Sequence, residues 1–162
     1  MIRTADPYRD LAVIDSGAPR FNQMVVGFVS VIVLFTGWWW LLGLLAAQML
    51  AGLTLGRQFC LTCLVYFEFV QPRVGEGPLE DARPPRVANW IGFVLLWVAT
   101  LAYLARLTTV AEILTGLVAA LAWLAALTGF CTGCQAYKLG RRLVGRPFVS
   151  CPIPPRPTGP GA

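Results

Sequence analysis

The sequence contains a run of 35 residues, from Phe21 to Leu55, without a single ionisable side chain. One helix crosses the hydrocarbon core of a bilayer with about 20 residues, so this run is long enough for two helices in tandem. Residues 36–40 (Thr-Gly-Trp-Trp-Trp) mark a turn between them, because glycine permits a chain reversal and tryptophan favours the membrane–water interface. The run therefore predicts two membrane-spanning helices, at 21–36 and 39–57.

A second apolar region, 87–130, is interrupted by Arg106 and Glu112, with two threonines between them that can cap a new helix. It predicts a third helix at 88–106 and a fourth at 109–130. Residues 58–70 are apolar and aromatic and predict an interfacial helix or a re-entrant segment, and the basic residues 137–142 predict a further interfacial helix. The expected fold class is an all-α integral membrane protein with four transmembrane helices and interfacial helices after the second and the fourth.

The composition agrees with a membrane protein and excludes several kinds of site. Hydrophobic residues make up 57% of the chain and charged residues 13%, whereas a soluble domain has about 25% charged residues. The chain contains no histidine, which excludes a Ser-His-Asp triad, a histidine-ligated haem and a mixed Cys/His zinc site within it. The net charge of +5 does not indicate a nucleic-acid partner, because the basic residues flank apolar segments. Residues 1–20 lack the apolar core of a signal peptide, so we expect the first spanning segment to direct insertion.

The two halves of the chain resemble each other. Each begins with Pro-Arg followed by an asparagine, at 19–22 and 85–89, and ends in Phe-Cys-x-x-Cys, at 59–63 and 130–134. Each half has an even number of predicted helices, so the halves run the same way and form parallel two-helix repeats. The expected domains are a polar lead (1–20), the first repeat (21–75), a linker (76–86), the second repeat (87–145) and a Pro-rich tail (146–162).

The distribution of basic residues predicts the orientation in the membrane. Twelve of the 13 lysines and arginines lie in the N-terminal lead, in the 57–86 connection or in the C-terminal stretch. Arg106 alone lies in a turn on the other side. The positive-inside rule then places both termini and both cysteine pairs on the cytoplasmic side of a multi-pass protein.

The two C-x-x-C pairs are the best candidates for chemistry. Cysteines at i and i+3 on a helix lie on one face, within reach of a disulfide or of one metal ion. In a thiol–disulfide interpretation, Cys60 and Cys131 are the attacking thiols, and Cys63 and Cys134 resolve the mixed disulfide. If each pair directly follows a spanning helix, the attacking cysteine lies at the carbonyl end of that helix, where a thiolate is disfavoured. If the helix is interrupted before the pair, the cysteine lies at the start of a new helix, where a thiolate is favoured.

Two other interpretations of the cysteines remain open. Convergence of Cys60, Cys63, Cys131 and Cys134 would form a four-cysteine zinc or iron–sulfur site; otherwise the cofactor is unknown or absent. Alternatively, the pairs are small apolar packing residues in a non-catalytic accessory subunit of a larger membrane complex. Cys151, in the Pro-rich tail, has no assigned role.

Residues 19–22 (Pro-Arg-Phe-Asn), 84–86 (Pro-Pro-Arg) and 129–137 (Gly-Phe-Cys-Thr-Gly-Cys-Gln-Ala-Tyr) resemble a family of bacterial membrane proteins. The family is filed as a domain of unknown function, number forty-three ninety-five, and the resemblance covers about 15–145, with the pair at 60–63 departing from the usual form. It implies a location in the bacterial inner membrane. Because members occur with thioredoxin-like or sulfurtransferase proteins, it also implies thiol or sulfur chemistry. The expected partners are membrane lipid and a thioredoxin-like protein or a larger membrane complex, with no nucleic acid.

Overall fold

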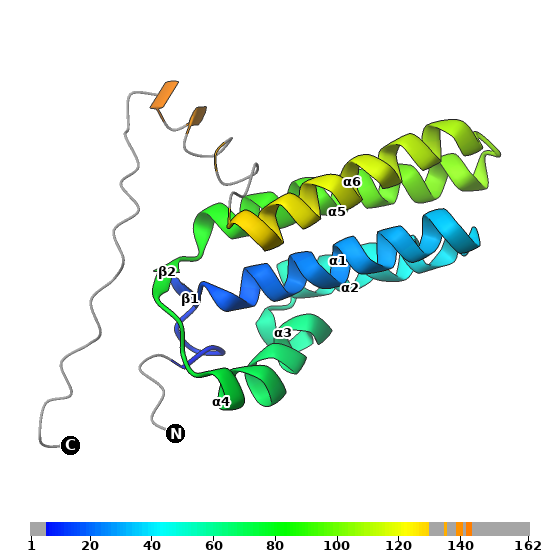
Figure 1. Ribbon diagram of the computed structural model, residues 1–162. Helices are drawn as coiled ribbons and strands as arrows, with labels where there is room; N and C mark the ends of the chain where they lie inside the picture. The colour runs from blue at the N-terminus through cyan, green and yellow to red at the C-terminus, as the bar shows by residue number, and fades with distance from the viewer. Residues whose placement is uncertain (1–5, 130–134, 136–138, 141, 144–162) are drawn as a thin grey trace, which may run out of the picture.

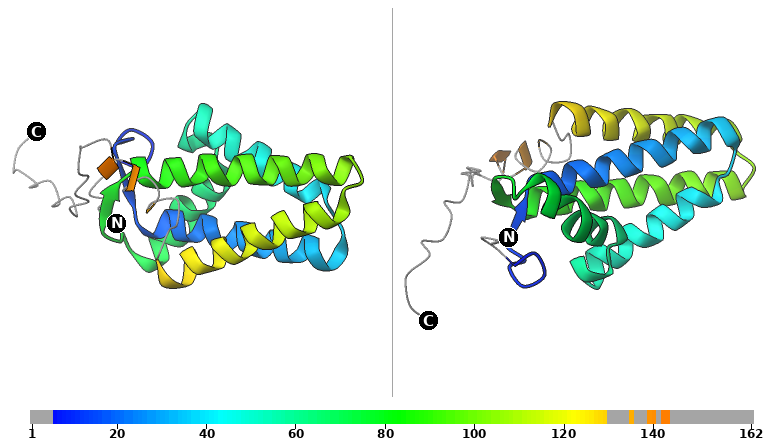
Figure 2. Two further views of the ribbon diagram at one scale, coloured as in Figure 1. Left: turned by 90° about the horizontal axis from the view of Figure 1, so that it is seen from above. Right: turned by 60° about the horizontal axis from the view of Figure 1, so that its bottom comes forward.

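The computed structural model describes residues 6–129, 135, 139–140 and 142–143. Over these residues the chain is mostly helical, and its long helices form two hairpins that lie side by side with their turns at the same end (Figures 1 and 2). The first hairpin consists of α1 (Gly17–Thr36) and α2 (Trp40–Thr54), and the second of α5 (Arg83–Leu104) and α6 (Thr108–Thr128). The predicted tail (146–162) lies outside the described residues, as do residues 137, 138 and 141 of the predicted interfacial helix at 137–142.

Between the hairpins the chain forms a series of short elements. In order, these are a 3-10 turn (Arg57–Phe59), α3 (Leu61–Val65), a π-helical turn (Tyr66–Val70), α4 (Gln71–Val74) and the strand β2 (Leu79–Asp81). The segment predicted as interfacial or re-entrant is therefore helical, but it is broken twice. It lies beside the open end of the first hairpin (Figure 1).

A two-stranded antiparallel sheet departs from the all-α expectation. Strand β1 (Val13–Asp15) pairs with β2 in the register Val13↔Asp81 to Asp15↔Leu79. The polar lead and the linker, predicted as separate connections, are thus joined. The sheet lies at the open end of the hairpins, where α1 and α5 begin (Figure 1).

Among the described residues, three helices (α1, α5 and α6) are long and apolar enough to cross a membrane. Helix α2 has 15 residues, which corresponds to about 22 Å against a hydrocarbon core of about 30 Å. The predicted helix at 39–57 was too long, because the helix ends at Thr54 and the chain turns at Gly56, where φ is 105°. Positive φ of this kind is readily adopted by glycine.

Helices pack between the hairpins more than within the first one. Helix α1 lies against α6, and α2 lies against α5, whereas α1 and α2 touch far less. The buried face of α6 is built mainly of small residues, and Gly27 of α1 lies against the ring of Trp123. Such residues let helix backbones approach closely. The central core consists of Val26, Val33, Leu42, Leu45, Ala46, Met49, Leu96, Ala99, Val118 and Ala122.

The outer surface of the hairpins is apolar. Many large hydrophobic side chains on the four long helices are exposed, among them Phe28, Phe35, Leu44, Val94, Ile113 and Leu117. A soluble monomer rarely exposes so extended an apolar surface. The extent of this apolar surface agrees with an arrangement in which the helices face lipid.

Candidate functional site

Activation of the first cysteine pair requires that the helix is interrupted before it. This interruption lies directly before Cys60. After α2 the chain turns at Gly56, makes the 3-10 turn and becomes extended at Cys60, with φ −88° and ψ 108°. Helix α3 then begins at Leu61, which places Cys60 at its N-cap position and Cys63 in its first turn. The condition for activation of Cys60, a new helix that begins directly after it, is therefore met.

Close packing of α2 fixes the position of Cys60. A Cβ atom placed on Gly52 would lie 2.8 Å from Cβ and 3.2 Å from Sγ of Cys60. Real carbon atoms do not approach so closely, so the contact requires glycine at this position. Cys60 is 8% exposed, and Cys63 is partly buried.

The two thiols differ in their protonation. A hydrogen bond from the Cys63 thiol lowers the pKa of Cys60 to about 6, with further help from the Thr62 hydroxyl, although burial opposes the shift. The same hydrogen bond, together with burial, raises the pKa of Cys63, while the Arg57 charge acts in the opposite direction. Both cysteines are free. The shared hydrogen bond therefore favours a thiolate at Cys60 and a protonated thiol at Cys63.

A polar network connects the cysteine pair to both hairpins. The Thr62 hydroxyl lies 3.2 Å from Sγ of Cys60 and donates to Oδ1 of Asn22 at 2.8 Å. Nε2 of Gln48 donates to the same hydroxyl at 3.2 Å. Nδ2 of Asn22 in turn donates to Oδ1 of Asn89 at 3.4 Å, joining α1 to α5.

Both thiols line a cavity of about 120 Å³. A cavity needs roughly 10–15 Å³ on this scale for one water molecule, so this one has room for several waters or for a small ligand. Residues from the lead, α1, α2, α3 and α5 surround it, and its polar side chains are Asn22, Arg57, Cys60, Cys63, Arg86 and Asn89.

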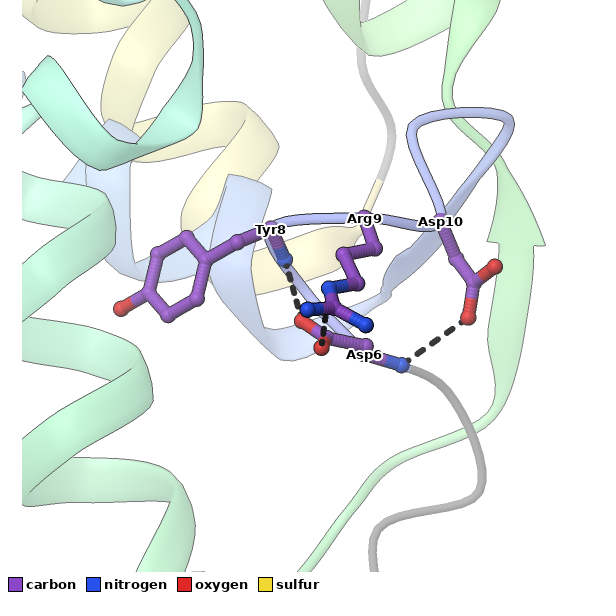
Figure 3. A network of polar contacts seen from close by, with 4 residues as sticks. All are labelled: Asp6, Tyr8, Arg9 and Asp10. Carbon is purple, nitrogen blue, oxygen red and sulfur yellow. Dashed lines mark hydrogen bonds and ion pairs between the residues drawn. The ribbon is translucent and has the colours of Figure 1, made fainter.

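Hydrogen bonds from Arg57 hold the N-terminal segment, residues 6–11, beside this site. Nη1 of Arg57 donates to the carbonyl oxygens of Pro7 and Asp10, and Nη2 donates to that of Leu11. The segment also has its own network (Figure 3): Asp6 accepts a hydrogen bond from the Tyr8 N–H at 2.9 Å and lies 3.9 Å from Nε of Arg9. Leu11, the last residue held by Arg57, lines the cavity.

Residues 14–142 match the family model described as Domain of unknown function (DUF4395). The chain belongs to this family. No curated protein and no solved structure shows significant similarity to it. The resemblance inferred from the sequence motifs is therefore confirmed, and its boundaries agree to within three residues at each end.

The second cysteine pair of this DUF4395 protein, Cys131 and Cys134, lies outside the described residues, as does Cys151. Gly129, two residues before Cys131, caps α6 with φ 69° and lies against the guanidinium group of Arg20. Among the described residues, no group of three or more Cys, Asp or Glu side chains is arranged to hold a metal ion. The four-cysteine metal site therefore remains a prediction.

Several residues of the site were not predicted as functional. Asn22, Arg86 and Asn89 were recognised only as markers of the sequence repeat, yet all three line the cavity. Thr62 carried no signal, because its importance comes from a contact with Cys60 that depends on how α2 and α3 pack. These three repeat residues could have been recognised from the sequence, because polar residues next to or within apolar segments are costly and often functional.

Proposed function

We propose that this protein is a thiol–disulfide redox or sulfur-handling membrane protein that works with a soluble thioredoxin-like partner. The observation that carries the proposal is the Cys60–Cys63 pair at the wall of the cavity. A hydrogen bond from Cys63 lowers the pKa of Cys60 to about 6, and the Thr62 hydroxyl, which donates to Asn22, lies 3.2 Å from its sulfur. Reactive cysteines are thiolates in partly accessible, electropositive surroundings, and Arg57 and Arg86 supply such surroundings here.

The arrangement favours a definite order of steps. The Cys60 thiolate attacks a disulfide of the partner, forming a mixed disulfide and releasing one partner thiolate. Cys60 then no longer carries a negative charge, which removes one cause of the raised pKa of Cys63. The nearby Arg57 charge still favours the thiolate form of Cys63. Cys63 gives its proton to the partner thiolate already released and attacks Sγ of Cys60, which breaks the mixed disulfide and releases the second partner thiolate, to be protonated by water. The products are a Cys60–Cys63 disulfide and a partner dithiol, so two electrons pass from the protein to the partner.

The proposal places the chain in the membrane with four spans, the second of them short. A short apolar helix is accommodated by local thinning of the bilayer or by interfacial anchors, and residues 38–40 (Trp-Trp-Trp), which begin α2 or directly precede it, would serve as anchors. Because twelve of the 13 basic residues belong to the N-terminal lead, the 57–86 connection or the C-terminal stretch of the sequence, both termini and the site would face the cytoplasm.

Three contacts support a parallel repeat. The first helix of each hairpin packs on the second helix of the other. The equivalent asparagines, Asn22 and Asn89, meet each other, as residues near a twofold axis would. Arg86 donates to the Leu53 carbonyl at the end of α2, and its counterpart Arg20 lies against Gly129 at the end of α6. In this arrangement Cys131 and Cys134 form a second redox pair.

The test is a count of reactive thiols and of metal on one purified sample. Reversible conversion of Cys60 and Cys63 between dithiol and disulfide, identified by alkylation and peptide mass spectrometry, supports the proposal. One zinc or iron per chain with the four thiols protected would support the metal site instead. Thiols that are inert in the native protein, without metal, would favour the accessory-subunit interpretation.

A further inference from the structure

The cavity beside Cys60 carries an unbalanced positive charge. Its 16 lining residues include Arg57 and Arg86 but no aspartate or glutamate. Burial lowers the pKa of Arg57 most, and the neighbouring Cys63 raises it. The Arg86 charge comes next and lowers it, so the two guanidinium groups are near enough to repel each other, while Asp10 acts more weakly in the opposite direction. Two cations facing one cavity repel each other, and an anion between them would relieve this repulsion.

The donors at the cavity are only partly used by the protein. Arg86 donates from Nη2 to the Leu53 carbonyl; within the part of the chain that the structure describes, no carboxylate lies at ion-pair distance from its guanidinium group. The Nδ2 group of Asn89 has no acceptor among these residues either, since Asn89 takes part in the network through Oδ1. Guanidinium and amide groups together match the planar and tetrahedral oxygens of oxyanions.

We propose that this cavity binds a small oxyanion beside Cys60, held by Arg86 and Asn89 within the field of Arg57. The inference rests on the proposed function, because it names the class of reactant presented to the Cys60 thiol. Two guanidinium groups leave two positive charges to be neutralised while Cys60 is a thiol, and one when it is a thiolate. The oxyanion is either a free solute or the phosphate group of an anionic lipid, since the cavity lies at the end of the bundle where α1 and α5 begin (Figure 1).

Binding of the oxyanion and ionisation of Cys60 would oppose each other. An anion beside the thiolate disfavours it, and by reciprocity the thiolate weakens binding of the anion. The Cys60→Ser variant should therefore bind the oxyanion more tightly than the unmodified protein. A cavity that merely holds water predicts no such coupling.

The experiment uses the full chain in nanodiscs of phosphatidylcholine, with inorganic sulfate as the probe at constant ionic strength set by chloride. The rate of Cys60 alkylation by neutral iodoacetamide is followed by peptide mass spectrometry at pH 5, below the pKa of Cys60, where the rate is proportional to the small thiolate fraction. We expect sulfate to slow it about fivefold or more and to raise the thermal unfolding midpoint. The Arg86→Gln variant should lose both effects. Arg83→Gln should keep them, because Arg83 lies on the same helix, one turn away, and does not line the cavity.

A second arm identifies the source of the oxyanion. If phosphatidylglycerol nanodiscs slow the alkylation without added sulfate, and do so only with Arg86 present, the ligand is a lipid headgroup. If sulfate acts equally in both lipids, it is a free solute. Fast alkylation that neither sulfate nor phosphatidylglycerol changes would overturn the inference and leave the proposed function standing. Cys60 inert to iodoacetamide would instead overturn the proposed function, and sulfate would then be tested by its effect on the unfolding midpoint of Cys60→Ser.

Discussion

The hydroxyl group of Thr62 donates a hydrogen bond to Oδ1 of Asn22 across 2.8 Å, while its oxygen lies 3.2 Å from the Cys60 sulfur. A hydroxyl group has one proton to donate. When Cys60 is a thiol, it can donate to this oxygen; when Cys60 is a thiolate, it competes with Asn22 for the Thr62 proton. Ionisation of the cysteine is therefore linked to the contact between α3 and α1, and through Asn89 to α5.

The first prediction concerns the acidity of Cys60. Because the thiolate is the reacting form, the alkylation rate of Cys60 should rise with pH through about 6 and level off above it. The Cys63→Ala variant removes the largest cause of the low pKa, so its profile should move toward the ordinary value of about 8.5. The measurement is the pH dependence of iodoacetamide alkylation, assigned to Cys60 by peptide mass spectrometry. Identical profiles in the two proteins would contradict the assigned hydrogen bond.

The second prediction concerns Thr62. Thr62→Val keeps the shape of the side chain but removes the hydroxyl group, so the pKa of Cys60 should rise, by less than in Cys63→Ala. The buried Oδ1 atom of Asn22 also loses its donor, which costs about 1–3 kcal/mol of unfolding free energy. Thr62→Ser retains the hydroxyl group and is the control. A Val variant that matches the Ser variant in both pH profile and thermal unfolding would show that the hydroxyl group has no role.

The third prediction concerns the contact between Gly52 and Cys60. Gly52→Ala brings a Cβ atom within 2.8 Å of Cys60 Cβ, so α2 and α3 must move apart at a cost of about 1–3 kcal/mol. The matched control is Gly116→Ala, because a Cβ atom on Gly116 meets nothing within 4 Å and alanine favours a helix. Thermal unfolding in detergent should show a lower midpoint for the Gly52 variant alone. A Gly52 variant as stable as the Gly116 variant would contradict the close packing.

The hairpins were predictable from the sequence because long apolar runs leave few alternatives to spanning helices. The break before Cys60 was anticipated as a condition for its activation, although its cause, the turn at Gly56, was not identified. The sheet was not predicted, because two three-residue strands in polar segments carry no pattern of their own. Their pairing is stabilised by contacts of Asp15 with residues that lie far from it in the sequence.

The fourth prediction concerns this buried aspartate, which is 2% exposed. Its carboxylate accepts hydrogen bonds from the N–H groups of Gly17 and Gly77 at 2.8 and 3.2 Å, and from Nε2 of Gln71 at 2.9 Å. Next to burial, its charge also raises the pKa of Tyr66 to about 12. Asp15→Asn replaces an acceptor by a donor that faces other donors, so the loss should be about 2 kcal/mol.

The control for Asp15→Asn is Asp81→Asn. Asp81 accepts an exposed hydrogen bond from the Arg83 N–H at 2.8 Å, so its replacement should cost only about 0.5 kcal/mol. Thermal unfolding and protease accessibility of residues 71–81 are the measurements. Equal stability of the two variants would contradict a structural role for the buried carboxylate.

The cavity was the least predictable part of the site. Arg86, Asn22 and Asn89 come from the starts of two different helices, and they meet Cys60 only because the hairpins pack side by side. Periodicity within one helix cannot indicate such a meeting. Arg57 lies only three residues before Cys60 in the sequence, but its hydrogen bonds to the N-terminal segment were not predicted.

The most direct test of the central claim is a redox titration of the purified protein in membranes. The protein is equilibrated in buffers of defined thiol–disulfide potential and its free thiols are then trapped. The state of the Cys60–Cys63 peptide is determined by mass spectrometry. We predict a reversible two-electron transition between dithiol and disulfide, in the range of about −270 to −180 mV that spans thioredoxin and protein disulfide isomerase. Cys60 and Cys63 that remain separate thiols at every potential, or that are protected by one bound metal ion per chain, would contradict the account.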